Sequence, residues 1–385
     1  MDYFHNVDMC KNHQNKITMK SFLVYGLSNG RGGVESIVLS IMSCLPECKF
    51  DILLSEGSCA YEELFNSNVN RINIASWGRS PQKFKADLES VLNNRIYDYV
   101  WINGCLMANR SIISVVRKYS NAKIITHSHG TSFEEGSAIK SVILKILHYV
   151  NRPFYLENTD FPCCCSLKSA EWYYGKNFCK KQKVFVVNNG VDVERFQFNK
   201  TTRDTLRAEL AAGDSFVLFH AGRLTHVKNQ TKILEITKSL INSGKNVKLW
   251  IAGVGELEEH LKQYASELGI SSMVSFLGFR NDVSSLCQAA DAFLLPSFHE
   301  GLPVTIIEAQ ATGLSCFVSD RVTREADVSG LVDFIPIEKS SDEWAGEINN
   351  FKYMSDREAA TSLIKSKRFD LDSVAEDFFK FITAI

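Results

Sequence analysis

The chain has 385 residues, 45% of them hydrophobic and 23% charged, which is the composition of a globular protein too long for one ordinary core. Its net charge of −1 excludes the overall basic field of nucleic-acid-binding proteins, so no nucleic acid is expected as a partner. No apolar run approaches the ~18 residues of a membrane-spanning helix, and the polar residues 1–18 lack the apolar region of a secretory signal.

These absences predict a cytoplasmic protein whose membrane contacts, if it makes any, are peripheral. Residues 1–18 are expected to be a flexible extension, with a start at Met19 as the alternative.

Short β-rich runs alternate with helical patterns up to residue 190, which is typical of parallel α/β units. The predicted strands are Phe22–Tyr25, Phe50–Leu54, Ile72–Ile74, Tyr99–Ile102, Lys123–Thr126 and Val184–Val187, with Phe161–Ser166 as a further candidate. The predicted helices between them include Val34–Met42, Phe84–Leu92 and Arg110–Lys118.

Another helical pattern covers residues 139–150. Its apolar residues at helical spacing are Ile139, Val142, Ile143, Ile146, Leu147 and Val150. Lys140, Lys145 and Arg152 flank this stripe, so docking on a membrane surface is one interpretation. The other, which we favour from the sequence, is an ordinary helix packed on the core.

The alternation restarts in the second half. Its predicted strands are Phe216–His220, Lys248–Ala252, Val274–Leu277, Ala292–Leu295, Ser315–Val318 and Asp333–Ile335. Its predicted helices include Ile233–Ser243, Glu256–Leu268, Thr305–Thr312 and an amphipathic Ser373–Ile385. Two such series predict two doubly wound, Rossmann-like α/β domains that face a cleft, over residues 1–192 and 193–370, followed by a helix over 371–385. Ligands of such sheets bind beyond the carboxyl ends of strands.

The segment from Glu300 to Glu308 follows one of these strand ends. Pro303 suits the first helical turn, because its missing N–H needs no partner there. The amides near Gly301 and Leu302 then form an anion site at a helix N-terminus. The two carboxylates bracket this site, where they can accept bonds from hydroxyls on either side of a diphosphate.

A second motif, residues 220–228, follows the strand Phe216–His220. Arg223 and Lys228 combine a guanidinium fork with an ammonium point charge, which is a common clamp for a diphosphate. Such a clamp stabilises a leaving diphosphate without a metal ion, so no metal or other cofactor is expected.

Weaker signals lie at other strand ends. Gly33 belongs to a glycine-rich turn that permits close backbone approach at a helix start. His127 and His129 follow the strand Lys123–Thr126, where a histidine can bind a sugar or acceptor hydroxyl. Phe279 and Arg280 are candidates for flanking a nucleobase. The pattern Gly253-Val-Gly255 is only half of a dinucleotide fingerprint.

Taken in order, these motifs resemble the family-four retaining glycosyltransferases, from Met19 to the end of the chain and most specifically in its second half. The segments that carry the resemblance are Gly-Gly-Val-Glu, His-Ser-His, residues 188–196, Gly-Arg-Leu, Ala-Gly-Val-Gly-Glu, Phe-Leu-Gly-Phe and Glu-x7-Glu. The resemblance implies a GT-B fold. In that fold the first domain is on the acceptor side, the second binds the nucleotide-sugar donor, and residues 371–385 cross back to the first domain.

The resemblance also implies roles for the candidate residues. Arg223 and Lys228 would bind the donor diphosphate, Glu300 the donor sugar and Glu308 the ribose. Further contacts would come from Gly301 and Leu302 through their amides, from Gly33 across the diphosphate, and from His127 or His129 at the transferred sugar. No general base is assigned, since the leaving phosphate itself would help to deprotonate the acceptor.

The expected enzyme is therefore a retaining hexosyltransferase that uses a UDP-sugar. Its expected acceptor is a glycan, such as a lipid-linked oligosaccharide of bacterial surface polysaccharide synthesis, at the inner face of the plasma membrane. Two alternatives stay open: a nucleotide-sugar epimerase of GT-B architecture and a non-catalytic sugar-nucleotide-binding protein. A nicotinamide oxidoreductase is disfavoured, because the full dinucleotide fingerprint is missing.

Overall fold

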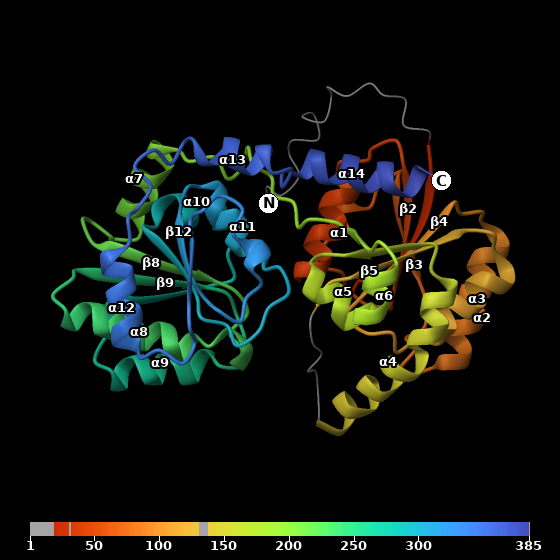
Figure 1. The fold of residues 1–385 in the computed structure, drawn as a ribbon, viewed down its shortest axis with the longest axis horizontal. Helices are drawn as coiled ribbons and strands as arrows, with labels where there is room; N and C mark the ends of the chain where they lie inside the picture. The colour runs from red at the N-terminus through yellow and green to blue at the C-terminus, as the bar shows by residue number, and fades with distance from the viewer. Residues whose placement is uncertain (1–18, 31, 131–137, 385) are drawn as a thin grey trace. The chain divides into compact units, whose positions relative to one another are not determined.

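The computed structural model describes residues 19–30, 32–130 and 138–384, so the expected flexible extension over residues 1–18 lies outside the described residues. Contacts divide the chain into two units, each built on one parallel sheet (Figure 1). The first unit comprises the chain up to Asn188 together with Val374–Ile385, and the second comprises Asn189–Ser373.

The first unit has a seven-stranded parallel sheet in the order β3-β2-β1-β4-β5-β6-β7. Its strands are β1 (Ser21–Tyr25), β2 (Lys49–Leu54), β3 (Val69–Asn73), β4 (Tyr99–Gly104), β5 (Lys123–Ser128), β6 (Phe161–Cys164) and β7 (Phe185–Val186). Its helices are α1 (Gly33–Ser43), α2 (Pro81–Asn94), α3 (Arg110–Tyr119), α4 (Ala138–Asn158), α5 (Leu167–Tyr174), α6 (Lys176–Lys181) and α14 (Leu371–Thr383), with a short 3-10 turn at Glu62–Leu64.

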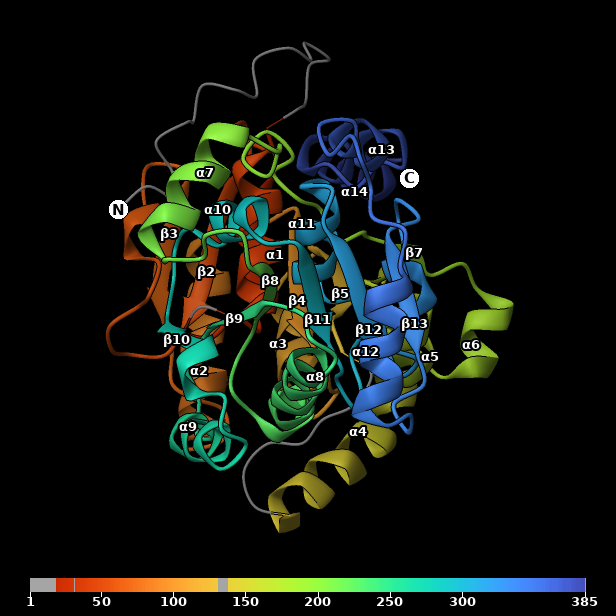
Figure 2. The ribbon, with the colours of Figure 1, turned by 90° about the vertical axis from the view of Figure 1, so that its left-hand side faces the viewer.

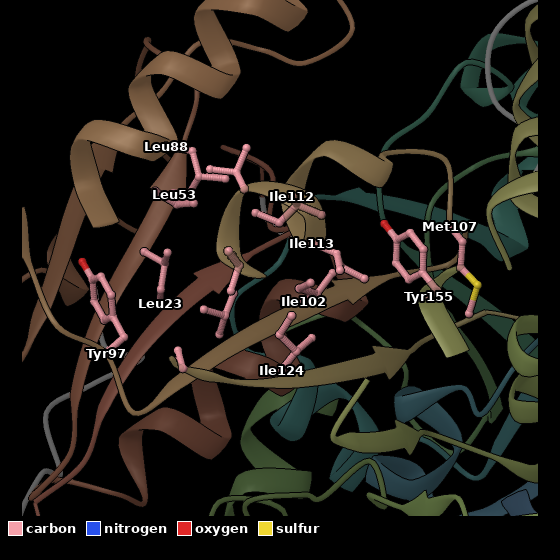
Figure 3. Close-up of a cluster of buried hydrophobic side chains, with 14 of the residues drawn as sticks. Leu23, Leu53, Leu88, Tyr97, Ile102, Met107, Ile112, Ile113, Ile124 and Tyr155 are labelled. Atoms are coloured by element: carbon pink, nitrogen blue, oxygen red, sulfur yellow. The ribbon is translucent and has the colours of Figure 1, made fainter. Parts of the chain in front are cut away.

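The strands bury almost continuous apolar runs, as expected when helices cover both faces of a parallel sheet. Helices α1 and α14 lie on one face, and α2, α3 and α4 on the other (Figure 1). The buried cluster of Figure 3 includes Leu23, Leu53, Ile102 and Ile113 of the strands and helix α3, together with Tyr155 of α4. On the α14 side, the Trp101 ring stacks on Phe378, with 4.7 Å between ring centroids.

The second unit has a six-stranded parallel sheet in the order β10-β9-β8-β11-β12-β13, which Figure 2 shows strand by strand. Its strands are β8 (Phe216–Ala221), β9 (Val247–Ala252), β10 (Val274–Gly278), β11 (Ala292–Leu295), β12 (Ser315–Ser319) and β13 (Val332–Ile335). Its helices are α7 (Lys200–Glu209), α8 (Gln230–Asn242), α9 (Glu258–Glu267), α10 (Val283–Ala289), α11 (Val304–Ala311), α12 (Ser341–Asn350) and α13 (Ala360–Ser366), with 3-10 turns at His226–Lys228, Ser271–Met273 and Arg324–Ala326.

The predicted fold class, two Rossmann-like parallel α/β domains, is confirmed, and every predicted strand is present. The largest displacement is at Ile72–Ile74, where the strand is Val69–Asn73. This edge strand has only two apolar residues, Val69 and Ile72, and is only partly buried, so its apolar signal is weak.

The expected core packing of residues 139–150 is wrong. Ile139, Val142, Ile143, Ile146 and Val150 are all more than half exposed. The described part of the chain contains no helix with both the length and the hydropathy needed to cross a bilayer.

Candidate active site

In the second unit, the loop after β8 runs directly against the loop after β9, and glycine makes this approach feasible. Gly253 has a φ of +140°, and a Cβ at this position would lie 2.0 Å from the carbonyl oxygen of Gly222. A Cβ at Gly255 would lie 2.2 Å from the carbonyl oxygen of Leu224. The Leu224 N–H in turn donates to the Val254 carbonyl at 3.1 Å. The half fingerprint in the sequence is therefore explained by loop packing.

A buried histidine–glutamine pair beneath these loops holds the backbone of Arg223. The Nδ1–H of His220 donates to the Leu294 carbonyl at 2.9 Å, which leaves Nε2 to accept from Nε2 of Gln230 at 3.2 Å. The same Gln230 nitrogen donates to the Arg223 carbonyl at 2.9 Å. Burial lowers the pKa of His220 to about 4, so the ring stays neutral and can keep this pattern. The side chain of Arg223 itself is exposed.

The loop after β11, residues 296–303, is joined to the loop after β8. The Phe298 N–H donates to the Val227 carbonyl at 2.9 Å. Asn229 is in the left-handed region with a φ of +53°, and its Nδ2 donates to the Pro296 carbonyl at 3.1 Å. These two bonds bring Lys228 beside the second loop.

Lys228 and Glu300 form an ion pair, with 2.6 Å between Nζ and Oε1. Their side chains are 20% and 15% exposed, so the pair is largely shielded yet can still be reached from solvent. The sequence assigned these two residues to different parts of one ligand, but it did not predict their contact. A phosphate oxygen can accept from the ammonium while a sugar hydroxyl donates to the carboxylate. The pair can therefore bind both parts of a sugar phosphate.

Helix α11 begins at Val304, one residue before the predicted range Thr305–Thr312, but the predicted place of Pro303 in its first turn is wrong. Pro303 occupies the capping position, with φ −70° and ψ 118°, rather than the first helical turn. The preceding residue explains the extended backbone, because the Leu302 carbonyl accepts from Nδ2 of the buried Asn189 at 2.5 Å. Leu302 and Gly301 therefore lie in a tethered loop directly before the helix. Asn189 was missed as a site residue, although its Asn-Asn-Gly context marked the join between the two halves.

Glu308 lies in the second turn of α11 and is partly exposed. Burial raises its pKa to about 7, and the nearby positive charge of Arg195 opposes this rise. A carboxyl group that is only half ionised near neutral pH gains charge when hydrogen-bond donors approach it. Hydroxyls of a bound ligand would have this effect.

Phe279 and Arg280 follow β10 and differ in what they offer a ligand. The ring of Phe279 is 62% exposed, and the Gly278 carbonyl just before it accepts from the Gly253 N–H at 2.7 Å. Arg280 has its guanidinium fork on Asp282, at 2.7 and 2.5 Å. The exposed ring is therefore the better candidate for stacking.

In the first unit, Gly33 opens helix α1 and is exposed, and a Cβ at this position would meet no atom within 4 Å. The loop before it is braced by the buried Glu35, which accepts from the Ser28 N–H at 2.8 Å and from the Gly32 N–H at 3.1 Å. Arg31, in the middle of the predicted motif, lies outside the described residues. Glu35 thus fixes the shape of the loop and leaves its backbone as the surface that a ligand can meet.

The two candidate histidines have different surroundings. His127 is fully buried, with its ring parallel to that of Trp101 at a centroid distance of 6.0 Å. His129 is partly exposed, and its Nε2 bonds to Oδ1 of Asn103 at 2.9 Å. Burial lowers the pKa of His129 to about 3 and that of His127 well below its usual range, so both rings are neutral. Of the two, only His129 presents its ring at the end of β5.

A cavity of about 220 Å³ lies at the opposite, amino end of the second sheet. It is lined in part by Arg203, Asp291 and Arg357. Arg203 bonds to Asp291, and both arginines bond to backbone carbonyls, including that of Ala290. These arginines cap the end of helix α10, so we assign this cavity to packing rather than to the candidate site. Within the described residues, no cluster of three or more His, Cys, Asp or Glu side chains is placed to hold a metal ion.

The loops of the second unit that carry Arg223, Lys228, Glu300 and Phe279 fall inside a recognised sequence family. Residues 202–368 match the family described as Glycosyl transferases group 1. This match lies within the second unit, and together with the relatives named below it supports a glycosyltransferase. It is 28% identical over 326 residues to EpsF of Bacillus subtilis, whose name assigns it to the glycosyltransferases, and the match covers 83% of this chain and 84% of EpsF.

A second relative is the Escherichia coli UDP-Gal:alpha-D-GlcNAc-diphosphoundecaprenol alpha-1,3-galactosyltransferase. It is 28% identical over 300 residues, covering 75% of the glycosyltransferase described here and 76% of the relative. Among solved structures, HepE of Anabaena in complex with UDP and glucose matches with a TM-score of 0.77 at 19% identity, covering 95% of this chain and 100% of HepE. This likeness identifies the fold as GT-B.

Proposed function

We propose that this glycosyltransferase transfers a hexose from a UDP-sugar, with retention of anomeric configuration, to a hydroxyl of a lipid-linked oligosaccharide in bacterial surface polysaccharide synthesis. The ion pair of Lys228 and Glu300 beside the start of α11 carries this proposal. It places a cation for phosphate and an acceptor for sugar hydroxyls within one hydrogen-bond length of each other. The lipid anchor of the acceptor would place the reaction at the cytoplasmic face of a membrane.

The donor is divided among the residues of the second unit. Lys228 and the exposed Arg223 hold the diphosphate, and Glu300 accepts from hydroxyls of the sugar. Glu308 accepts from the ribose hydroxyls, and the exposed ring of Phe279 stacks on the base. Two side-chain cations balance the charge that develops on the leaving group, so the reaction needs no metal ion.

In the reaction, the bond between the anomeric carbon and the β-phosphate oxygen breaks, and a bond from that carbon to the acceptor oxygen forms. The acceptor proton passes to the leaving phosphate, and the products are UDP and the extended glycan. His129 of the first unit bonds to a hydroxyl of the reacting sugars. Because its ring is neutral, we assign it positioning rather than proton transfer.

Two comparisons support the choice of substrates. The name of the Escherichia coli relative includes a UDP-sugar donor and a diphosphoundecaprenol acceptor. The HepE crystals contain UDP and glucose.

The test is incubation of the purified protein with UDP-, GDP- and ADP-sugars, with and without a GlcNAc-diphosphoundecaprenol acceptor. Release of UDP together with an extended lipid-linked product, unchanged by EDTA, is the expected result. Conversion of the donor sugar without any acceptor would instead identify an epimerase. Binding without release of any nucleoside diphosphate would identify a non-catalytic binding protein.

A further inference from the structure

Helix α4 of the first unit exposes a continuous apolar face, which we call the α4 face. Its six residues are between 51% and 74% exposed and recur every three or four positions along the helix: Ile139, Val142, Ile143, Ile146, Tyr149 and Val150. At 1.5 Å per residue, the face is about 17 Å long. Within its unit, the amino-terminal part of α4 extends away from the other labelled helices (Figure 1).

Over residues 139–151, the buried residues of α4 are all polar, namely Ser141, His148 and Asn151. This part of the helix is the reverse of an ordinary surface helix. Nδ2 of Asn151 donates to the carbonyls of Met107 and Ala108, at 2.9 and 3.0 Å. Nδ1 of the buried His148 accepts from the Met107 N–H at 3.1 Å. Specific hydrogen bonds therefore hold the helix in place, and its apolar residues are left to face the solvent. Contiguous exposed apolar surface of this kind marks a site of interaction.

Positive charge lies beside the α4 face. Residues 176–183, which comprise α6 and the two residues after it, contain four lysines and no acidic residue. Lys176, Lys180, Lys181 and Lys183 are all exposed. Lys145 of α4 adds a further, partly exposed cation on the same helix as the apolar face. Its long side chain can reach past the apolar residues to a charged layer.

A cavity of about 330 Å³ joins the two elements, since it is lined by Arg152 and Leu156 of α4 and by residues 174–178. Arg152 bonds to the Trp172 carbonyl at 2.8 Å, and among the described residues no carboxylate pairs with its guanidinium. Burial lowers the pKa of Arg152, which reflects the cost of holding an uncompensated cation in this position. Lys176 lines the same cavity and is 3.8 Å from a carboxylate oxygen of the exposed Glu171, so this surface pair is open to exchange with a lipid phosphate. Two cations around one cavity suit an anionic headgroup.

We propose that the α4 face and the α6 lysines dock the protein on an anionic lipid bilayer. The apolar residues enter the boundary between headgroups and acyl chains, with the helix lying in the plane of the surface. The lysines face the headgroups, and the cavity at Arg152 takes a lipid phosphate. Charge favours this occupant over an apolar protein partner, because the exposed lysines of residues 176–183 match a negative surface. The inference is independent of the proposed reaction.

The test is flotation of the full-length protein with vesicles of phosphatidylcholine alone and of phosphatidylcholine mixed with phosphatidylglycerol. The protein should float with the anionic vesicles, much less with the neutral ones, and less as salt is raised. The double variant Ile143→Asp/Ile146→Asp should lower the bound fraction about tenfold, because it places two charges in the acyl boundary. Ile96→Asp is the matched control, since Ile96 is 95% exposed in the same unit but lies outside the face.

The charged side is tested separately. Lys180→Glu/Lys181→Glu should lower binding to anionic vesicles about tenfold or more. Lys83→Glu/Lys85→Glu on α2, a pair of exposed lysines in the same unit, should leave it unchanged. Arg152→Gln should weaken binding to anionic vesicles and leave the residual binding to neutral ones as it is. UDP affinity, measured on every variant, reports that the protein remains folded.

Three outcomes would overturn the proposal. The first is that the wild-type protein fails to float with anionic vesicles. The second is that the Ile143→Asp/Ile146→Asp and Ile96→Asp variants float equally well. The third is that the α4 variants change the oligomeric state on gel filtration while lipid binding stays the same, which would assign the face to a second copy of the chain.

Discussion

Both sheets need a glycine where two backbone segments approach closely, but the loops at their carboxyl ends carry different side chains. In each unit, a glycine with positive φ follows a strand and lies against the backbone of a neighbouring segment, which is the end of β4 for Gly26 and the loop after β8 for Gly253. A Cβ at Gly26 would lie 1.8 Å from the Asn103 carbonyl oxygen, and one at Gly253 would lie 2.0 Å from that of Gly222. The glycine is thus a requirement of the architecture and says little about the ligand.

The difference lies in the side chains that these loops carry. The second unit presents Lys228, Glu300 and the exposed Arg223, whereas the first presents His129, which is neutral, and a backbone loop braced by Glu35. Formal charge suits a nucleoside diphosphate, and neutral hydrogen-bonding groups suit a glycan. Among the described residues, the comparison therefore supports the proposal that the second unit binds the donor and the first contacts the acceptor.

The largest effect should come from the ion pair. Glu300→Ala and Lys228→Ala are each expected to lower turnover about 10²- to 10³-fold, because each removes a charge that the transition state uses. Steady-state kinetics with a UDP-sugar and a lipid-linked acceptor measures this. The matched control is Lys339→Ala, which breaks a pair of the same 2.6 Å length with Glu347 in the same unit. If either site variant turned over as fast as the wild type, the assignment of Lys228 and Glu300 to the active site would be wrong.

The two glycines test the architecture directly. Gly26→Ala and Gly253→Ala should each cost about 2–3 kcal/mol of stability, since both combine a strained φ with a backbone clash. Only Gly253→Ala should also weaken UDP binding, as measured by calorimetry. Gly244→Ala controls for strain alone, because its φ is +89° but a Cβ there meets no atom within 4 Å. Equal loss of UDP affinity in both variants would break the assignment of the donor to one unit.

Glu308 should make donor binding depend on pH. Its pKa of about 7 is raised, so the carboxyl gains a proton as the pH falls below neutrality and then accepts hydroxyl hydrogen bonds less well. If only the ionised form binds, the Kd for UDP rises about tenfold between pH 8 and pH 6. In Glu308→Gln this part of the dependence should vanish and leave only the titration of the nucleotide. A wild-type profile identical to that of the variant would contradict the ribose assignment.

The smallest effect is expected at His129. Removing one neutral hydrogen bond is worth about 1 kcal/mol, so His129→Ala should lower transfer several-fold. UDP affinity should stay unchanged, because the residue belongs to the unit that does not hold the donor. A loss of UDP affinity as large as the loss of transfer would place His129 on the donor instead.

The strands and the charged loop residues were predictable because their signals are local. A buried parallel strand is a short apolar run, and polar residues just after it are at a ligand-binding edge whatever the rest of the chain does. Arg223, Lys228, Glu300 and Glu308 were chosen as candidate site residues in this way. Their contacts were not predictable, because the ion pair depends on Asn229 and Phe298, which join two loops 70 residues apart in the sequence.

Burial was the less predictable property. Residues 127 and 129 point to the same side of β5, so alternation cannot separate them. The burial of His127 depends on Trp101 and, through its stack with Phe378, on a helix some 250 residues further along the chain. Likewise, the spacing of apolar residues in α4 showed which of them share a face. It did not show that this face is exposed while the polar His148 and Asn151 are buried.

The position of α14 has a consequence for synthesis on the ribosome. This last helix belongs to the first unit, although the whole second unit precedes it in the chain. The first sheet therefore emerges with the Trp101 side uncovered and stays so while nearly 200 further residues are translated. The second unit, which is continuous in sequence, can fold to completion earlier. A ribosome that pauses in the second half would thus expose an aromatic surface on the unit that was made first, which makes that interval the time when a chaperone is needed most.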